Sequence, residues 1–195
     1  MADQNLCACV GIDTRQMARH HKGKFVKPKH CLHFFENKNH PQDRWYVFDP
    51  VFLNQLANSA ISSSPNDTAG MISHIVANLT QTYPASASVV RINPDQSEWL
   101  FNNAGGAMGA MYIIHASVTE YLIIFGTPLG TEGHSGIHTA DDYFNILVGE
   151  QWAFKPGQLE MERYTPGMVH LMPRGVAKQY KMHKGCWALE YARGA

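Results

Sequence analysis

The chain has 195 residues, of which 45% are apolar, and its sixteen basic and sixteen acidic side chains give a formal net charge of zero. This length suits one domain with a sizeable core, and the charge balance argues against a nucleic-acid-binding protein or an acidic tail protein. No C-x2-C metal-binding spacing is present, so we interpret the cysteines as free thiols; they are Cys7, Cys9, Cys31 and Cys186.

The first part of the chain differs from the rest in charge. Residues 1–44 contain eight of the sixteen Lys and Arg residues and lack the apolar stretch of a signal peptide. We predict that residues 1–47 are disordered or bound to a surface, and that residues 48–195 form the folded domain. The longest apolar run, residues 111–124, contains His115 and Glu120 and therefore does not read as a membrane-spanning helix.

Two helices are expected next. Asp49-Pro50, followed by apolar residues at helical spacing, predicts a short helix, because proline is favoured in the first turn. Asp67 or Thr68 can cap a second helix that ends at Tyr83-Pro84. Its apolar stripe consists of Met71, Ile72, Ile75, Val76 and Leu79. These helices are expected to support the structure that follows.

From Trp99 onward the signals are those of β structure. Short segments rich in β-branched and aromatic residues alternate with turn residues, and 126–136 is rich in turn formers. The expected strands lie within 112–117, 119–125, 144–147, 160–164, 168–172, 177–182 and 187–191. Strands of this number and length predict a small barrel or sandwich. The predicted class is α+β, with N-terminal helices packed on the barrel.

Carboxylates within these apolar segments are the candidate functional groups. Strand alternation would place Cys186, Ala188 and Glu190 on one face of the last strand. If that face lines an apolar cavity, burial raises the pKa of Glu190, so that it can hold and deliver a proton near neutral pH. Asp141 or Asp142 is the candidate partner. The alternative is a carboxylate at a strand end that bonds to neighbours such as Arg193.

Several segments resemble a known family in their order and spacing. The fungal sterol delta-8 to delta-7 isomerases (C-8 sterol isomerases) and their animal relative, the sigma non-opioid receptor, are similar over 101–111, 115–121 and 125–136. Three further segments, 138–147, 178–182 and 188–194, resemble the fungal branch more than the receptor. The resemblance runs from about Phe48 to Gly194.

The resemblance implies a cupin-like barrel around an elongated apolar pocket and an acid–base reaction inside it. Shifting the sterol double bond adds a proton at C9 and removes one from C7, through a carbocation at C8. Glu190 is the implied pocket carboxylate, Asp141 its expected partner and Asp142 the second candidate, while His134 or His138 could orient or relay. Neither a metal nor an organic cofactor is implied, although His134, His138, Asp141 and His170 have the chemical types of metal ligands.

The resemblance also suggests partners. We expect a sterol substrate, cationic amphiphilic inhibitors that mimic the carbocation, the surface of the endoplasmic reticulum membrane and self-assembly. Aromatic side chains that could contact the sterol are Tyr112, Tyr121, Phe125, Phe144, Trp152 and Tyr164. Compared with the family, we expect this chain to be a truncated form that lacks the N-terminal membrane helix and the C-terminal membrane-facing helices. A non-enzymatic binder of sterols and cationic amphiphiles, like the sigma receptor, is therefore the alternative function.

Overall fold

The computed structural model describes residues 45–86 and 90–194. Most of the predicted segment 1–47, namely residues 1–44, lies outside the described residues, as do Cys7, Cys9 and Cys31. Cys186 is a free, buried thiol. No helix in the described part of the chain is long and apolar enough to cross a membrane.

Both predicted helices are confirmed. Helix α2 spans Pro50–Ser63, and its N-cap Asp49 accepts a hydrogen bond from the backbone N–H of Val51. Helix α3 spans Thr68–Thr82 and is capped by Asp67, which accepts from Gly70 N. These side-chain acceptors satisfy N–H groups that the first helical turn leaves without partners.

In the part of the chain that the structure describes, ten antiparallel strands follow in two sheets. The six-stranded sheet has the order β1-β2-β3-β10-β5-β8, and the four-stranded sheet has the order β4-β9-β6-β7. The strand bounds are β1 Trp99–Ala104, β2 Ala107–Ala116, β3 Glu120–Thr127, β4 Thr131–His134, β5 Asp141–Val148, β6 Gln151–Phe154, β7 Glu162–Tyr164, β8 Val169–Met172, β9 Gln179–Met182 and β10 Cys186–Arg193. The sequence pattern did not predict β1, β4 and β6 as separate strands.

Strand β4 was hidden by glycine. The run 126–136 reads as turn-rich, yet Thr131–His134 pairs with β9 in full register. A Cβ atom on Gly133 would lie 2.4 Å from the backbone nitrogen of Ala107, so the glycine permits close contact between β4 and β2. A residue type that usually weakens a strand is therefore needed here to bring the two sheets together.

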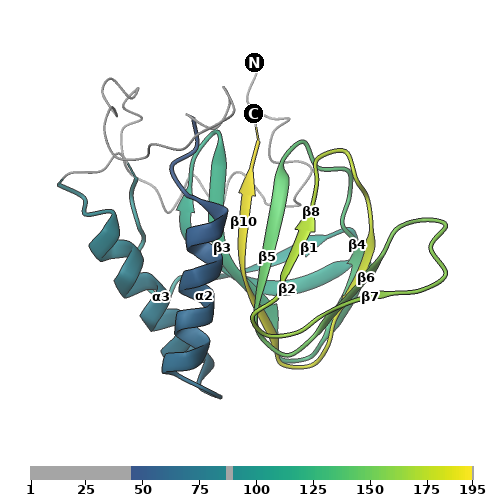
Figure 1. Ribbon diagram of the computed structural model, residues 1–195, viewed down its shortest axis with the longest axis horizontal. Helices are drawn as coiled ribbons and strands as arrows, with labels where there is room; N and C mark the ends of the chain where they lie inside the picture. The colour runs from purple at the N-terminus through teal and green to yellow at the C-terminus, as the bar shows by residue number, and fades with distance from the viewer. Residues whose placement is uncertain (1–44, 87–89, 195) are drawn as a thin grey trace.

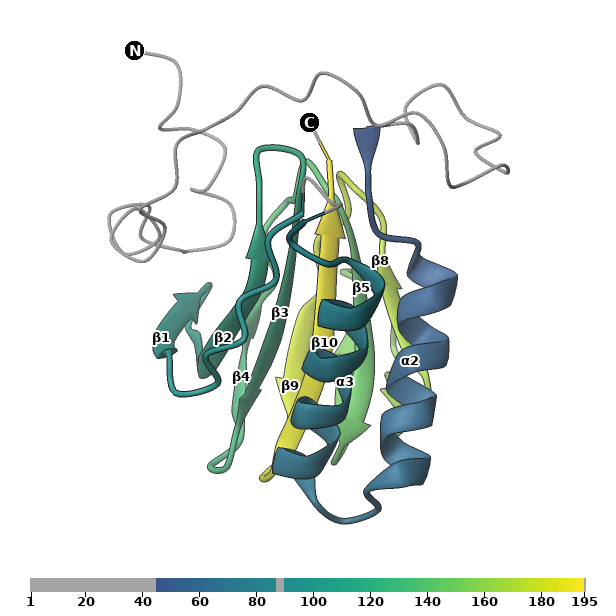
Figure 2. The ribbon, with the colours of Figure 1, turned by 90° about the vertical axis from the view of Figure 1, so that its left-hand side faces the viewer.

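The molecule has three layers, with the six-stranded sheet in the middle (Figures 1 and 2). One face of this sheet packs against α2 and α3, using residues such as Tyr112, Leu189 and Tyr191. The other face packs against the four-stranded sheet, using residues such as Phe125 and Phe144. The predicted α+β class and cupin-like architecture are confirmed, although the strands form two separate sheets rather than one closed ring.

A buried carboxylate joins the chain before α2 to the central sheet. Glu120 on β3 is 5% exposed and accepts hydrogen bonds from Val47 N at 2.7 Å and from the Tyr191 hydroxyl at 2.7 Å. The same tyrosine hydroxyl lies 3.1 Å from the carbonyl oxygen of Phe48. These bonds fix β10 to β3 and to the segment that leads into α2, and thereby orient the other face of β10.

Replacing Tyr191 with phenylalanine should destabilise the protein. The change removes the shortest hydrogen bond to Oε2 of Glu120 in a dry environment, so we expect the free energy of unfolding to fall by about 1 to 3 kcal/mol. Tyr143→Phe is the matched control, because its hydroxyl accepts a longer bond, 3.3 Å, from Arg193. Urea unfolding measures both; equal losses would contradict an anchoring role for Glu120.

Candidate functional site

A small cavity of about 40 Å³ lies between the two sheets. Its wall combines aromatic and aliphatic groups with titratable ones, as sites for small organic ligands commonly do. The lining residues are Asn102, Phe125, Ser135, His138, Asp142, Phe144, Gln151, His170, Met172, Lys178, Tyr180 and Glu190.

Two carboxyl groups enter this cavity from neighbouring strands. Glu190 on β10 is 5% exposed and Asp142 on β5 is 1% exposed. In the strand register Glu190 is paired with Phe144, and Asp142 lies two residues before Phe144 on the same face. Such diagonal neighbours have their Cα atoms roughly 7 to 8 Å apart, within reach for strong coupling in a dry site. The alternation predicted for Glu190 is confirmed, since Cys186 and Ala188 pack on the cavity side and Leu189 and Tyr191 on the helix side.

Burial raises the pKa of both carboxyls. The pKa of Glu190 rises from its ordinary value of 4.5 to about 7, against the opposing effect of a 2.7 Å hydrogen bond from the Tyr121 hydroxyl. The pKa of Asp142 is well above its ordinary value because of burial and the nearby charge of Glu190. Ionisation of Glu190 disfavours ionisation of Asp142, so the two carboxyls lose their protons in separate steps. The pair combines a proton donor with a carboxylate at neutral pH.

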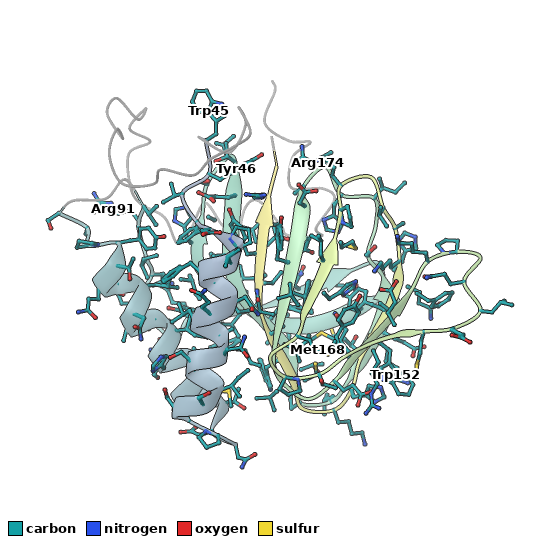
Figure 3. The ribbon with its side chains drawn as sticks, viewed as in Figure 1. Trp45, Tyr46, Arg91, Trp152, Met168 and Arg174 are labelled. Carbon is teal, nitrogen blue, oxygen red and sulfur yellow. The ribbon has the colours of Figure 1, made fainter. Side chains whose placement is uncertain are left out.

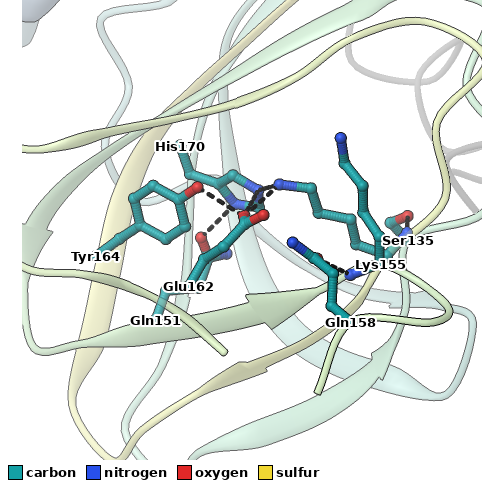
Figure 4. Close-up of polar contacts among 8 residues, drawn as sticks. Ser135, Gln151, Lys155, Gln158, Glu162, Tyr164 and His170 are labelled. Carbon is teal, nitrogen blue, oxygen red and sulfur yellow. Dashed lines mark hydrogen bonds and ion pairs between the residues drawn. The ribbon is translucent and has the colours of Figure 1, made fainter. Parts of the chain in front are cut away.

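A second polar cluster lies on the β8 side of the cavity (Figure 4). The buried ammonium of Lys178 forms an ion pair with Glu162 and lies 2.9 Å from Nε2 of His170. Because the ammonium can only donate, Nε2 accepts, and Nδ1 of His170 carries the proton that it donates to Oε1 of Gln151 at 2.7 Å. Burial and the charge of Lys178 lower the pKa of His170 to about 4, so this imidazole is neutral.

The structure separates the two adjacent aspartates. Asp141, which the resemblance favoured as partner of Glu190, faces away from the cavity and accepts hydrogen bonds from the backbone and the guanidinium of Arg174, both at 3.0 Å. Partial burial raises the pKa of Asp141, but the bonds and charge of Arg174 outweigh it, and the pKa lies below its ordinary value. Asp142 is the carboxyl that lies with Glu190.

The other predicted residues divide between the cavity and other surroundings. His134 is exposed and its Nδ1 accepts from Gly136 N, so it does not line the cavity. Tyr112 packs on the helix side, and its hydroxyl donates to the carbonyl oxygen of Asn93. Trp152 contacts His183 and is not among the lining residues; Figure 3 shows it at the lower right of the molecule.

Four of the predicted aromatic residues lie in or beside the cavity. Phe125 and Phe144 line it, with ring centroids 6.3 Å apart. Gly109 makes room for Phe125, because a Cβ atom there would lie 2.7 Å from the phenylalanine ring. Tyr121 reaches Glu190, and Tyr164 stacks on His170 at 4.3 Å.

Sequence reasoning missed several lining residues. Asn102, Ser135, Gln151, Met172, Lys178 and Tyr180 were not among the candidates. Alternation offers one signal: Lys178, Tyr180 and Met182 share one face of the segment that was expected to be a strand, and two of these three line the cavity. Lysine is seldom fully buried, so composition alone favours an exposed position for Lys178. In the described part of the chain no three His, Cys, Asp or Glu side chains gather as a metal site.

The raised pKa of Glu190 predicts a pH-dependent stability. Between pH 4.5 and about 7 Glu190 carries a proton in the folded protein that it has lost in the unfolded chain, so its contribution to the free energy of unfolding decreases as the pH rises through this window. Glu190→Gln should flatten this dependence and stabilise the protein above pH 7. Urea unfolding at several pH values measures the slope. The exposed Glu132, changed to glutamine, is the control; identical slopes in all three proteins would contradict a buried titrating pair.

Comparisons with known proteins show the family to which this chain is similar. The family model described as ERG2 and Sigma1 receptor like protein matches residues 29–195. C-8 sterol isomerase from Pyricularia oryzae is 59% identical over 152 residues, covering 78% of this chain and 67% of that protein. The Aspergillus fumigatus protein named C-8 sterol isomerase erg2 is also 59% identical, covering 78% of this chain and 62% of its own length. The identity to a sigma receptor is lower, at 36%, which confirms the expected closer similarity to the fungal branch.

Sigma non-opioid intracellular receptor 1 from Gallus gallus is 36% identical, with 76% of this chain and 64% of the receptor covered. The chain thus spans about two thirds of the length of these relatives. Among solved structures, an RmlC-like cupin from Shewanella frigidimarina is 15% identical, covers 51% of this chain and 87% of its own, and has a TM-score of 0.42. With its family model matched over most of its length, the chain belongs to the family of ERG2 and Sigma1 receptor like proteins.

Proposed function

We propose that this protein is a C-8 sterol isomerase that shifts the ring double bond of a sterol from delta-8 to delta-7 in ergosterol biosynthesis. The observation that carries the proposal is the coupled pair Asp142 and Glu190, buried together in an apolar cavity. The high identity to fungal proteins named C-8 sterol isomerase supports the same reaction.

The reaction needs one proton donor and one proton acceptor. Protonated Asp142 donates its proton to C9, and the electron pair of the C8–C9 double bond forms the new C9–H bond, which leaves a carbocation at C8. The carboxylate of Glu190 stabilises this cation, because a fixed negative charge acts strongly in a dry site. Glu190 then removes a proton from C7, and the C7–H electron pair becomes the C7–C8 double bond.

After the reaction the proton is on Glu190 and Asp142 is ionised. Transfer of this proton from Glu190 to Asp142 restores the starting state. The Tyr121 hydroxyl, which donates to Oε1 of Glu190, holds this carboxylate in place and favours its ionised form. The double-bond shift is redox neutral and consists of two proton transfers. The two carboxyl groups supply both of them.

The proposal extends to the ligand and its surroundings. A sterol is larger than the cavity, so binding must displace lining side chains such as Phe125, Phe144 or Met172. Cationic amphiphiles would bind by pairing an ammonium with ionised Glu190, which mimics the carbocation. Because a sterol partitions into lipid, we place the protein at the endoplasmic reticulum membrane surface, where self-assembly is a further part of the proposal.

Activity can be tested by sterol profiling in a fungal strain that lacks its own delta-8 isomerase. The chain should restore delta-7 sterols, and either Glu190→Gln or Asp142→Asn should reduce the rate by at least about a hundredfold, since each removes a group that moves a proton. Asp141→Asn is the matched control: it is the sequence neighbour of Asp142 but bonds to Arg174 outside the cavity, and it should retain near-normal activity.

Two results would overturn parts of this scheme. Loss of activity in Asp141→Asn with normal activity in Asp142→Asn would reverse the assignment of the two aspartates. Accumulation of delta-8 sterol with every variant, together with binding of a cationic amphiphile that Glu190→Gln abolishes, would favour the non-enzymatic binder.

A further inference from the structure

Three of the residues that line the cavity each have a buried polar atom without a hydrogen-bond partner. Within the described residues these atoms are Oδ1 of Asn102, Nδ1 of His138 and Oδ1 of Asp142. A buried polar atom without a partner costs free energy, and such atoms are rare unless a water or a ligand completes them. Asp142 already has a proposed role as proton donor, but no role has yet been assigned to Nδ1 of His138.

The hydrogen bond of the His138 ring indicates which of its two nitrogens carries the proton. Its Nε2 lies 2.6 Å from the carbonyl oxygen of Ser135. A carbonyl oxygen can only accept, so Nε2 carries the proton, and Nδ1 of the neutral ring is an acceptor with a free lone pair. Burial lowers the pKa of His138, which keeps the ring in this neutral form. The cavity therefore contains a neutral acceptor in addition to its two carboxyls.

The backbone around His138 fixes this acceptor in place. Ser135 N donates to the carbonyl oxygen of Lys178 at 2.9 Å, and Lys178 N donates to Oγ of Ser135 at 2.9 Å. The carbonyl oxygen of His138 itself accepts from Gly175 N at 2.8 Å. Rotating the ring would break its bond to Ser135, so Nδ1 is held at one position before any ligand arrives. Such preorganisation reduces the entropic cost of binding.

The chemistry of Nδ1 defines what it can bind. It requires a hydrogen-bond donor, and being neutral it has no advantage for a cation over a neutral group. An ammonium gains more from the carboxylate of Glu190. A sterol carries one strong donor, its 3-hydroxyl group, which would otherwise lose its hydrogen bonds to water when it is buried.

We propose that Nδ1 of His138 accepts a hydrogen bond from the 3-hydroxyl group of the sterol and so sets the specificity of the pocket for hydroxylated sterols. This inference rests on the proposed function, because it assigns one end of the same substrate. His138 comes from the segment between β4 and β5, whereas the carboxyls come from β5 and β10. The hydroxyl contact and the proton transfers are thus supplied by different parts of the structure.

Two substitutions at His138 separate its bond to Ser135 from its free acceptor. In His138→Gln the side-chain amide nitrogen can replace Nε2 and still donate to Ser135, but no acceptor remains at the position of Nδ1. In His138→Asn the amide oxygen can replace Nδ1 as acceptor. Thermal unfolding of both variants establishes that they are folded.

The substrates are a delta-8 sterol with its free 3-hydroxyl group and the corresponding 3-methyl ether, which cannot donate. Direct binding and the steady-state constants kcat and KM are measured with the full chain. The normal protein should prefer the hydroxyl form by about tenfold in affinity and KM, the effect expected for one hydrogen bond to a buried acceptor. His138→Gln should lose this preference with little change in kcat, and His138→Asn should recover part of it.

Failure of this inference can be distinguished from failure of the proposed function. If the chain isomerises the free sterol but His138→Gln keeps the tenfold preference, His138 has a structural role only, with a water on Nδ1, and the inference is wrong. If neither sterol is bound or isomerised while a cationic amphiphile still binds, both the proposed function and this inference are overturned.

Discussion

The central constraint in this structure is that strand β10 is buried on both faces. Leu189 and Tyr191 face the helices, while Ala188 and Glu190 face the second sheet. A shift of one residue in register would place Glu190 among the apolar side chains of α2 and α3 and an aromatic ring in the cavity. The contacts of Tyr191 with Glu120 and Phe48 favour the observed register, so the helical layer determines where the carboxyl of Glu190 points.

Burying two acidic groups beside each other opposes folding. Each carboxyl loses water, and ionisation of the second is further disfavoured by the charge of the first, which is why their pKa values rise. The apolar layer between the helices and the central sheet has to offset this cost. One face of the central sheet packs on the helices and supplies apolar burial, and the opposite face carries the two carboxyls. The helices therefore contribute to the candidate site without lining it.

Local patterns in the sequence were sufficient for part of this arrangement. Alternation in 186–191 predicted that Glu190 shares a face with Ala188. Pro50 and helical spacing predicted the first helix, and a cap at Asp67 or Thr68 predicted the second. The choice between Asp141 and Asp142 could not be made locally, because adjacent residues point to opposite faces and only the pairing of β5 with β10 decides which is inside. The burial of Lys178 depends on its ion pair with Glu162, which lies in a segment that the sequence pattern does not pair with it.

The pairing of Lys178 also bears on how the cavity can store a proton. A free ammonium in the same space would favour ionised carboxylates and lower the pKa of both Asp142 and Glu190. Glu162 balances that charge, and the neutral ring of His170 accepts a further hydrogen bond from the same ammonium. The lysine can therefore line the cavity while its positive charge is largely compensated. On this argument, the ion pair with Glu162 explains why Lys178 is not among the groups that shift the pKa of Asp142 or Glu190.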